Sequence, residues 1–462
     1  MSARTHISPD TIRSRFSAAM SAMYRDEVPA YGTLMELVGA VNRETLAADP
    51  AERARLAAND DLGRISEERH GAIRLGTTAE LHMMRRLFAV MGMLPVGYYD
   101  LSEAGVPVHS TAFRPVGEAA LKRNPFRVFT SLLRLDLIAD AALRAEAAAL
   151  LAARQIFTPA CVALIDKAEA AGGLTDAEAD RFVAEALETF RWQPRANVTL
   201  QMYHRLHDAH RLIADVVAFR APHINHLTPR TLDIDAVQAR MPGVGISPKA
   251  VVEGPPTRKC PILLRQTSFK ALQEPVAFRH GDGWEDGSHT ARFGEIEQRG
   301  VALTPKGRAL YDLLLTQTRA VARPAADGSN AAEYMAALAK VFAAFPDDWA
   351  TLRSEGLAYF TYSLTEKGVG ATVGDQSADA LIAKGVLRFD PVVYEDFLPV
   401  SAAGIFQSNL GDGAAQDFVA SPNQQRFEAD LGAAVLNEFE HYAAIEAASL
   451  AACRAALGKA VA

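Results

Sequence analysis

Two carboxylates and an arginine share one face of the stretch FGEIEQRG, which runs from Phe293 to Gly300. Side chains of a strand alternate between its two faces, so Glu295, Glu297 and Arg299 point the same way if this stretch is extended. Glu297 and Arg299 can neutralise each other. Burying the charge of an unpaired Glu295 would be costly, so the side chain would tend to keep its proton. A divalent metal ion bound to the carboxylate removes that cost. Glu295 is therefore a candidate metal ligand, with an arginine elsewhere in the chain as the alternative partner.

A histidine and an arginine share a face of a second candidate strand, in RHGAIR. His70, Ala72 and Arg74 alternate with residues of the opposite face. This order is typical of a ligand, a gap for a substrate and a clamp for an anion, because a guanidinium pairs well with a carboxylate. The alternative is a hydrogen-bonded core histidine with a surface arginine, and the spacing alone favours that alternative.

The stretch HINHLTPR contains His223 and His226, which face opposite sides of a strand over residues 224–228. We expect His226 to be the ligand because it lies deeper in the strand, while a histidine pair without a metal remains the alternative. Two imidazoles and one carboxylate suit ferrous iron with three positions left open. Ligands on separate strands argue against the HExxH helix of a zinc protease.

Other histidines are expected to have no role in chemistry. His204, His207 and His210 follow a three-residue spacing on a helix, which predicts a solvated face. His280 and His289 flank the turn-rich segment GDGWEDGS, so a loop position is expected for His289, with a place lining the site near Glu295 as the alternative. The chain also lacks a G-x-S-x-G nucleophile elbow, a P-loop and a dinucleotide-binding glycine motif.

The elements that must position these residues repeat along the chain. A short histidine-bearing strand, a helix and three strands are predicted over residues 62–137 and again over 219–305, and FTSLLR can be aligned with FGEIEQR. An alanine-rich helical insert is predicted at 138–218, and a helical and loop region at 306–462 is expected to complete the site. We expect a single compact domain over 1–462.

Composition limits the function classes. The chain has 462 residues, a net charge of −7 and 49% hydrophobic residues, so it predicts a globular protein without affinity for nucleic acid or anionic lipid. Three widely spaced cysteines predict neither a disulfide framework nor a metal knuckle, which fits a cytoplasmic protein. The first residues lack the apolar core of a signal peptide, and charges interrupt every long apolar run.

Four motifs, RHGAIR, HINHLTPR, FGEIEQRG and PVSAAGIFQSNL, together resemble the 2-oxoadipate dioxygenase/decarboxylase (hydroxyglutarate synthase) family of the vicinal oxygen chelate superfamily. The resemblance implies an α+β fold, with a barrel-like mixed sheet built from two βαβββ modules and extensive added helices. It implies an Fe(2+) site formed by His70, His226 and Glu295. The further implied residues are Arg74 on a substrate carboxylate, Val400 and Ser401 against the substrate, and Ser131 at the fourth corner of the metal site.

The implied reaction converts 2-oxoadipate and O2 into 2-hydroxyglutarate and CO2, as part of lysine degradation. Its partners would be a small 2-oxo dicarboxylic acid and O2, with neither nucleic acid nor membrane. Two alternatives remain open on the same scaffold, because one fold hosts many functions. One is a non-redox isomerase or lyase with another metal, and the other is a small-molecule binding protein without turnover.

Overall fold

The computed structural model describes residues 6–59, 61–269, 271–325, 328–371, 376–398 and 422–458. Its contacts divide the chain into two compact units. Unit 1 is formed by Met1–Val252, Gln266–Gln298 and Pro399–Leu436, and unit 2 by Glu253–Arg265, Arg299–Leu398 and Asn437–Ala462. Among the described helices, none is both long enough and apolar enough to cross a membrane.

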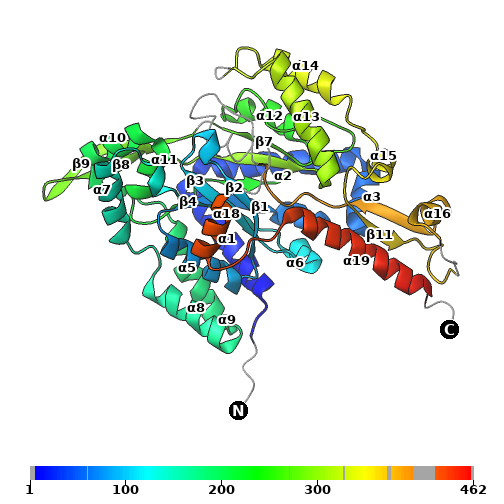
Figure 1. Cartoon of the computed structure of the whole chain (residues 1–462), viewed down its shortest axis with the longest axis horizontal. Helices are drawn as coiled ribbons and strands as arrows, with labels where there is room; N and C mark the ends of the chain where they lie inside the picture. Colours follow the sequence, from blue (N-terminus) through cyan, green and yellow to red (C-terminus); the bar gives the residue numbers. More distant parts are fainter. Residues whose placement is uncertain are drawn as a thin grey trace. The chain divides into compact units, whose positions relative to one another are not determined.

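A five-stranded sheet forms the centre of unit 1, with the strand order β2-β3-β4-β1-β6 (Figure 1). β1 pairs parallel with β4 and antiparallel with β6, and the other neighbours are antiparallel. The strands are β1 Arg69–Leu75, β2 Leu94–Asp100, β3 Val108–Arg114, β4 Arg127–Leu133 and β6 Leu227–Pro229. Helix α5 (Thr78–Val90) follows β1, so residues 62–137 contain the predicted β-α-β-β-β elements in order, with helix α6 (Glu118–Arg123) added between β3 and β4.

The second predicted module departs from a four-stranded sheet. Helix α12 (Ile234–Arg240) follows β6, and β7 (Leu264–Ser268) then pairs with β10 (Glu295–Arg299) in a separate ladder. The hairpin of β8 (Gln273–His280) and β9 (Gly283–Thr290) joins β5 (Arg195–Thr199) in a third sheet (Figure 1). The described part of the chain is a mixed α+β fold, as expected, but its strands form open sheets and no closed barrel. β6 spans three residues, which is too short to carry a full ladder.

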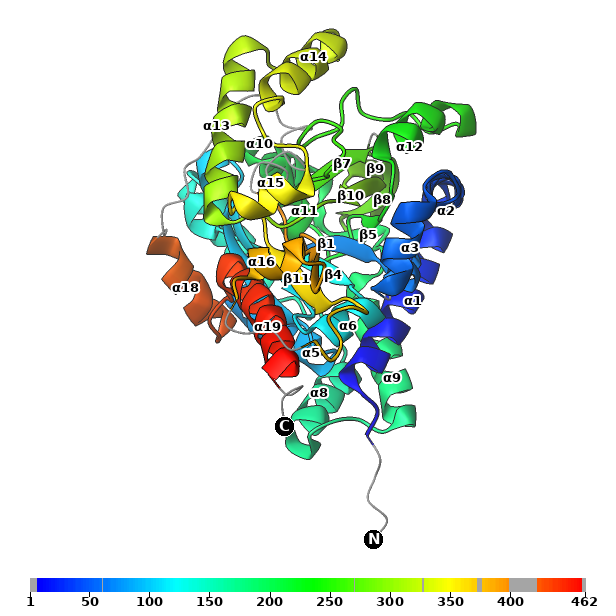
Figure 2. The same cartoon turned by 90° about the vertical axis from the view of Figure 1, so that its right-hand side faces the viewer.

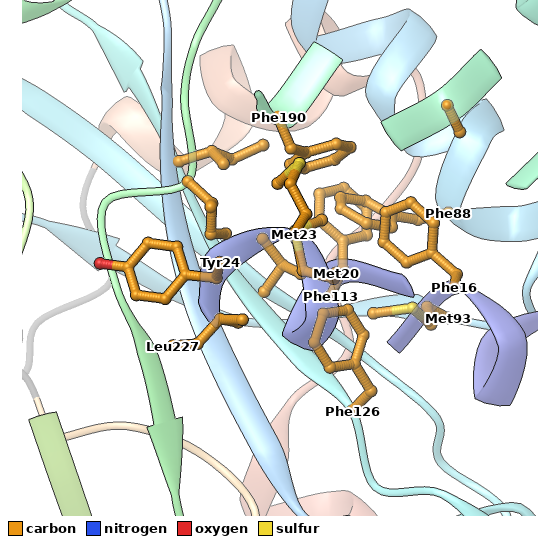
Figure 3. Packing of buried hydrophobic residues seen from close by; sticks show 14 of the residues in the cluster. Phe16, Met20, Met23, Tyr24, Phe88, Met93, Phe113, Phe126, Phe190 and Leu227 are labelled. Carbon is orange, nitrogen blue, oxygen red and sulfur yellow. The ribbon is translucent and has the colours of Figure 1, made fainter. Parts of the chain in front are cut away.

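Helix α1 (Pro9–Glu27) ties the core of unit 1 to the strands that carry the candidate site. Its side chains Phe16, Met20 and Tyr24 recur every fourth residue and are fully buried, as Figure 3 shows. Ser8 caps the helix by accepting a hydrogen bond from the backbone N–H of Thr11, and Pro9 occupies its first position. The Tyr24 hydroxyl donates to the carbonyl of Phe293 at 2.7 Å. The same hydroxyl lies 3.0 Å from the carbonyl of residue 225.

Residues 138–218 are mainly helical, as the sequence predicts, with β5 as the one strand among them. α8 packs on α9 and α5, whereas α10 packs on α11, β5 and β8 (Figure 1). The helices are α7 Ala141–Ala152, α8 Pro159–Ala171, α9 Asp176–Leu187, η3 Glu188–Phe190, α10 Leu200–Ala209 and α11 Arg211–Val217. The remaining helices of unit 1 are α2 Pro29–Ala48, α3 Pro50–Ala58, α4 Leu62–Glu67, η1 Ser102–Ala104, α6 Glu118–Arg123, η2 Leu135–Leu137, η4 Met241–Val244 and α18 Pro422–Leu431.

Unit 2 is built around a two-stranded antiparallel ladder, β11 (Phe360–Leu364) with β12 (Leu387–Pro391). Helix α19 (Glu438–Gly458) packs on β11, and α13 (Pro305–Val321) packs on α14 (Ala331–Phe342) (Figure 2). Two shorter helices, α15 (Trp349–Ser354) and α16 (Ala378–Ala383), complete the described part of this unit.

Candidate metal site and its supporting residues

Three adjacent strands present a row of polar side chains at one level of the unit 1 sheet. His70 on β1 is the register partner of Arg127 on β4 and of Thr228 on β6. Gly71 lets the segment before β6 come close to β1, because a Cβ there would lie 2.6 Å from Ile224 Cδ1. The strand pairing therefore brings the neighbourhood of residue 226 against His70.

His70, His226 and Glu295 converge in the interior of unit 1. Glu295 Oε2 lies 3.1 Å from His70 Nε2 and 3.7 Å from His226 Nε2. One ligand atom from each of the three residues lies within 4.8 Å of the others, and no side chain of the three is more than 3% exposed. The structure thus brings together three side chains that are 225 positions apart at their extremes, as the family resemblance implies.

Burial and the neighbouring charged groups together set the pKa values of these three residues. Burial lowers the pKa of His226 to about 3, so this imidazole is neutral. Burial by itself would raise the pKa of Glu295, but the hydrogen bond with His70 and the nearby histidines outweigh it, and the pKa lies below its usual value. For His70, burial is likewise outweighed by the charges of Glu297 and Glu295, and the pKa is raised.

The donor set fits a divalent metal ion. Both ring nitrogens of His226 lack a hydrogen-bond partner within the described part of the chain, although the ring is 1% exposed. Buried polar atoms normally have a hydrogen-bond partner. A metal ion on one ring nitrogen of His226 would therefore remove the free-energy cost of burying that nitrogen without a partner. Glu295 Oε2 is also approached by the Thr228 hydroxyl at 3.0 Å and the Gln266 amide at 3.2 Å, which orient the carboxylate. Two imidazoles and one carboxylate suit iron and its neighbours in the first transition row.

Arg74 belongs to a second buried cluster, which spacing along β1 did not reveal. Its Nη1 lies 2.5 Å from Asp215 Oδ2, and Asp215 Oδ1 accepts from His289 Nε2 at 2.9 Å. His223 Nε2 lies 3.3 Å from the same oxygen, and the Tyr203 hydroxyl lies 2.8 Å from His289 Nδ1. Arg74 and these histidines outweigh the effect of burial and hold the pKa of Asp215 well below its usual value.

The second cluster is a support for Arg74 rather than a metal site. Asp215, His223 and His289 are close enough to one another to hold a metal ion. A guanidinium on the same carboxylate opposes a second cation there, because two positive groups would share one buried negative charge.

Several sequence-based expectations are corrected or extended by the structure. His289 lies on strand β9 and is 3% exposed, so the expectation of a loop is wrong. Ser131 is the register partner of Arg74, and its hydroxyl lies 2.8 Å from that of Ser110. Val400 and Ser401 lie outside the described residues.

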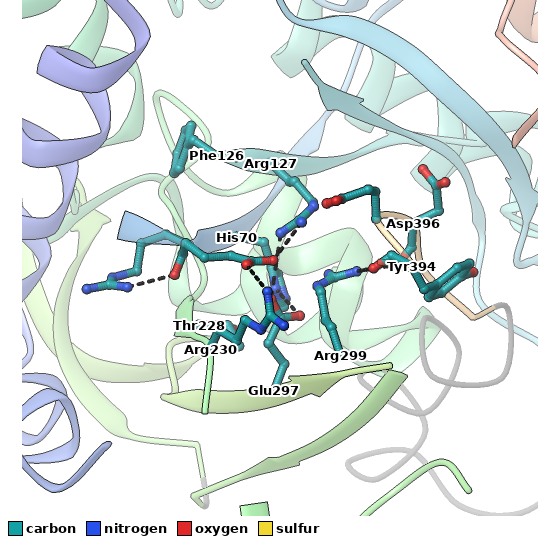
Figure 4. A network of polar contacts seen from close by, with 12 residues as sticks. His70, Phe126, Arg127, Thr228, Arg230, Glu297, Arg299, Tyr394 and Asp396 are labelled. Carbon is teal, nitrogen blue, oxygen red and sulfur yellow. Dashed lines mark hydrogen bonds and ion pairs between the residues drawn. The ribbon is translucent and has the colours of Figure 1, made fainter. Parts of the chain in front are cut away.

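Glu297 and Arg299 have partners that alternation along β10 did not reveal. Glu297 Oε2 lies 2.9 Å from His70 Nδ1. The Arg299 guanidinium donates to the carbonyls of Tyr394 and Asp396, each at 2.9 Å (Figure 4). No local pattern distinguishes such long-range pairs, since the partners are 95 to 227 positions apart along the chain.

Comparisons with known proteins agree with the motifs. The family model for 2-oxoadipate dioxygenase/decarboxylase matches residues 16–409. A 2-oxoadipate dioxygenase/decarboxylase of Pseudomonas putida is 60% identical over 462 residues, 99% of each chain. One from Escherichia coli is 54% identical over 450 residues, 97% of this chain and 98% of the relative.

A solved structure is similar over nearly the whole chain. It is the crystal structure of the hydroxyglutarate synthase from Pseudomonas putida in complex with 2-oxoadipate. It matches with a TM-score of 0.91 at 56% identity, covering 99% of this chain and all of that chain.

Proposed function

Because this chain belongs to the 2-oxoadipate dioxygenase/decarboxylase family, we propose that it converts 2-oxoadipate and O2 into 2-hydroxyglutarate and CO2 at an Fe(II) site. The protein is an oxygenase-type enzyme. The observation that carries the proposal is the convergence of His70, His226 and Glu295. The chain matches 99% of the length of the Pseudomonas putida 2-oxoadipate dioxygenase/decarboxylase.

The proposed reaction conserves atoms. The carboxyl group next to the keto carbon leaves as CO2, and the keto carbon becomes a carboxylate by gaining one oxygen atom of O2. The second oxygen atom is inserted into a C–H bond of the same molecule, which gives the hydroxyl group. When bound, ferrous iron supplies the redox chemistry with O2 that side chains lack.

The chain's own residues would hold the ion and exclude water. His226 is neutral and has a nitrogen without a hydrogen-bond partner, so it needs to lose no proton before binding. Thr228 and Gln266 hold the ligand carboxylate of Glu295 in one orientation. Three protein ligands leave positions open, as a substrate and O2 require.

Arg74 would bind a substrate carboxylate. A guanidinium fixes the angle as well as the position of a carboxylate, which a point charge does not. Arg74 shares strand β1 with His70, and alternation along the strand places both side chains on the same face. Val400 and Ser401 remain proposed substrate contacts on the strength of the family resemblance.

We also propose that the enzyme works in the cytoplasm and that residues 306–462 complete the site. All three cysteines are buried and free, which fits a reducing compartment.

Anaerobic loading with Fe(II), followed by measurement of O2 uptake, tests the proposed function. We expect 2-oxoadipate to consume one O2 per molecule and to yield CO2 and 2-hydroxyglutarate, whereas 2-oxoglutarate supports slower uptake. Loading with Zn(II) in place of Fe(II) should abolish uptake. Turnover of 2-oxoadipate without O2 consumption would instead indicate a non-redox enzyme, and binding without turnover would indicate a binding protein.

A further inference from the structure

His70 contacts two glutamates of β10, one with each ring nitrogen. Nε2 lies 3.1 Å from Glu295 Oε2. Nδ1 lies 2.9 Å from Glu297 Oε2, and Figure 4 shows these two residues beside each other. The side chains of His70 and Glu297 are fully buried. Glu295 and Glu297 are two residues apart, so both point to the same face of the strand. Strand β10 therefore provides a candidate metal ligand, Glu295, and a second carboxylate, Glu297, that contacts the other ring nitrogen of His70.

The position of Glu297 matches a common requirement of metal sites. A histidine that binds a metal through one nitrogen usually donates its other N–H to a carboxylate, which fixes the tautomer and makes the ring a stronger ligand. In the structure, His70 Nδ1 lies 2.9 Å from Glu297 Oε2, which is within hydrogen-bond distance.

A buried ion-pair network holds Glu297 in place. Arg127 Nη1 lies 3.7 Å from Glu297 Oε1, and its Nη2 lies 2.7 Å from Glu68 Oε1. Glu68 also accepts from Arg230 at 2.8 Å and contacts Arg64 at 3.3 Å. None of these side chains is more than 7% exposed. A buried charge is costly unless it is paired. The many buried charges beside His70 therefore indicate a role other than stabilising the fold.

We propose that Glu297 is a positioning residue for the metal site: it accepts the Nδ1 proton of His70 and so presents Nε2 as the ligand atom. Arg127 orients Glu297, and Glu68, which also pairs with Arg230, holds Arg127 in place. This inference rests on the proposed function, because it takes His70 as a metal ligand. Glu297 itself contacts neither the ion nor the substrate.

The Glu297→Gln variant tests the inference through metal affinity rather than turnover. Glutamine keeps the shape but accepts the proton more weakly, so we expect the Kd for Fe(II), measured anaerobically by chelator competition, to rise about 10- to 100-fold. The matched control is Glu118→Gln on the surface, where the side chain is 70% exposed, and it should leave the Kd unchanged. A wild-type Kd in Glu297→Gln overturns the inference.

A measurement on the unmodified protein decides the case even if Glu297→Gln does not fold. In Zn(II)-loaded protein with ¹⁵N-labelled histidine, NMR should show the His70 proton on Nδ1 and the metal on Nε2. A proton on Nε2 would overturn the inference. Wild-type protein that binds neither ion would instead refute the proposed metal site, so the two failures are distinguishable.

Discussion

Arg74 Nη1 lies 2.5 Å from Asp215 Oδ2, and this pair joins strand β1 to helix α11 inside unit 1. Both side chains are at most 10% exposed. The pair gives a long, flexible side chain one fixed direction, since His289 and His223 hold the other oxygen of Asp215. The arginine proposed to recognise the substrate is thus held by residues that do not share its strand.

Replacing Asp215 by asparagine should destabilise the protein. The change leaves the Arg74 guanidinium buried without its charged partner, so we expect the free energy of unfolding to fall by about 3 to 5 kcal/mol. Urea unfolding followed by circular dichroism measures this. The matched control is Asp208→Asn, where the side chain is 84% exposed, and it should change stability by less than about 0.5 kcal/mol. Equal stability of the two variants would show that the ion pair contributes little.

Arg74→Lys should keep the charge and lose most of the activity. Lysine cannot form the two parallel hydrogen bonds of a guanidinium, so the substrate carboxylate would lose its fixed angle. We expect kcat/KM for 2-oxoadipate to fall more than about tenfold, on the scale of a lost charged hydrogen bond. Arg205→Lys, an exposed arginine paired with Glu146, is the control. Near wild-type kcat/KM in Arg74→Lys would refute the clamp role.

Each of His70→Ala, His226→Ala and Glu295→Gln should remove iron while the fold persists. Loss of one ligand of three leaves too few donors for tight binding. Iron content, measured by elemental analysis after gel filtration, should fall well below that of wild type. The exposed His204→Ala variant should retain full iron content. Any of the three variants that keeps its iron would remove that residue from the proposed ligand set.

His109 should make the protein less stable as the pH falls below about 6.5. This side chain packs against Phe427 with ring centroids 4.7 Å apart, and burial lowers its pKa to about 4. Between these two pKa values the unfolded chain binds a proton that the folded chain excludes, so acid favours unfolding. The loss is complete near pH 4 and amounts to about 3 kcal/mol, since each pKa unit is worth about 1.4 kcal/mol.

The His109→Gln variant checks this prediction. It should show a smaller fall in Tm between pH 7 and pH 5 than wild type, because glutamine does not titrate. His280→Gln is the control, since the His280 side chain is 74% exposed. If His109→Gln and wild type lose the same Tm over this interval, His109 is not the group responsible.

Local sequence determined the helices and most strands of unit 1. Ser8 and Pro9 mark the start of α1, and Thr77 and Glu80 form the capping box of α5. The stretch RHGAIRL forms β1. Each of these signals lies within a few consecutive residues. The hairpin of β8 and β9 was missed because its polar, partly exposed residues lack the alternation that marks a half-buried strand.

The sequence alone also reduced the candidate ligands to a short set, but only through motifs that resemble a known family. Spacing on its own could not choose between a ligand and a core residue for His70. Only the tertiary structure shows that Glu295 and Glu297 contact different ring nitrogens of His70, and that Asp215 pairs with Arg74. Helix and strand patterns are set by near neighbours along the chain, whereas these pairings depend on which distant strands and helices pack together.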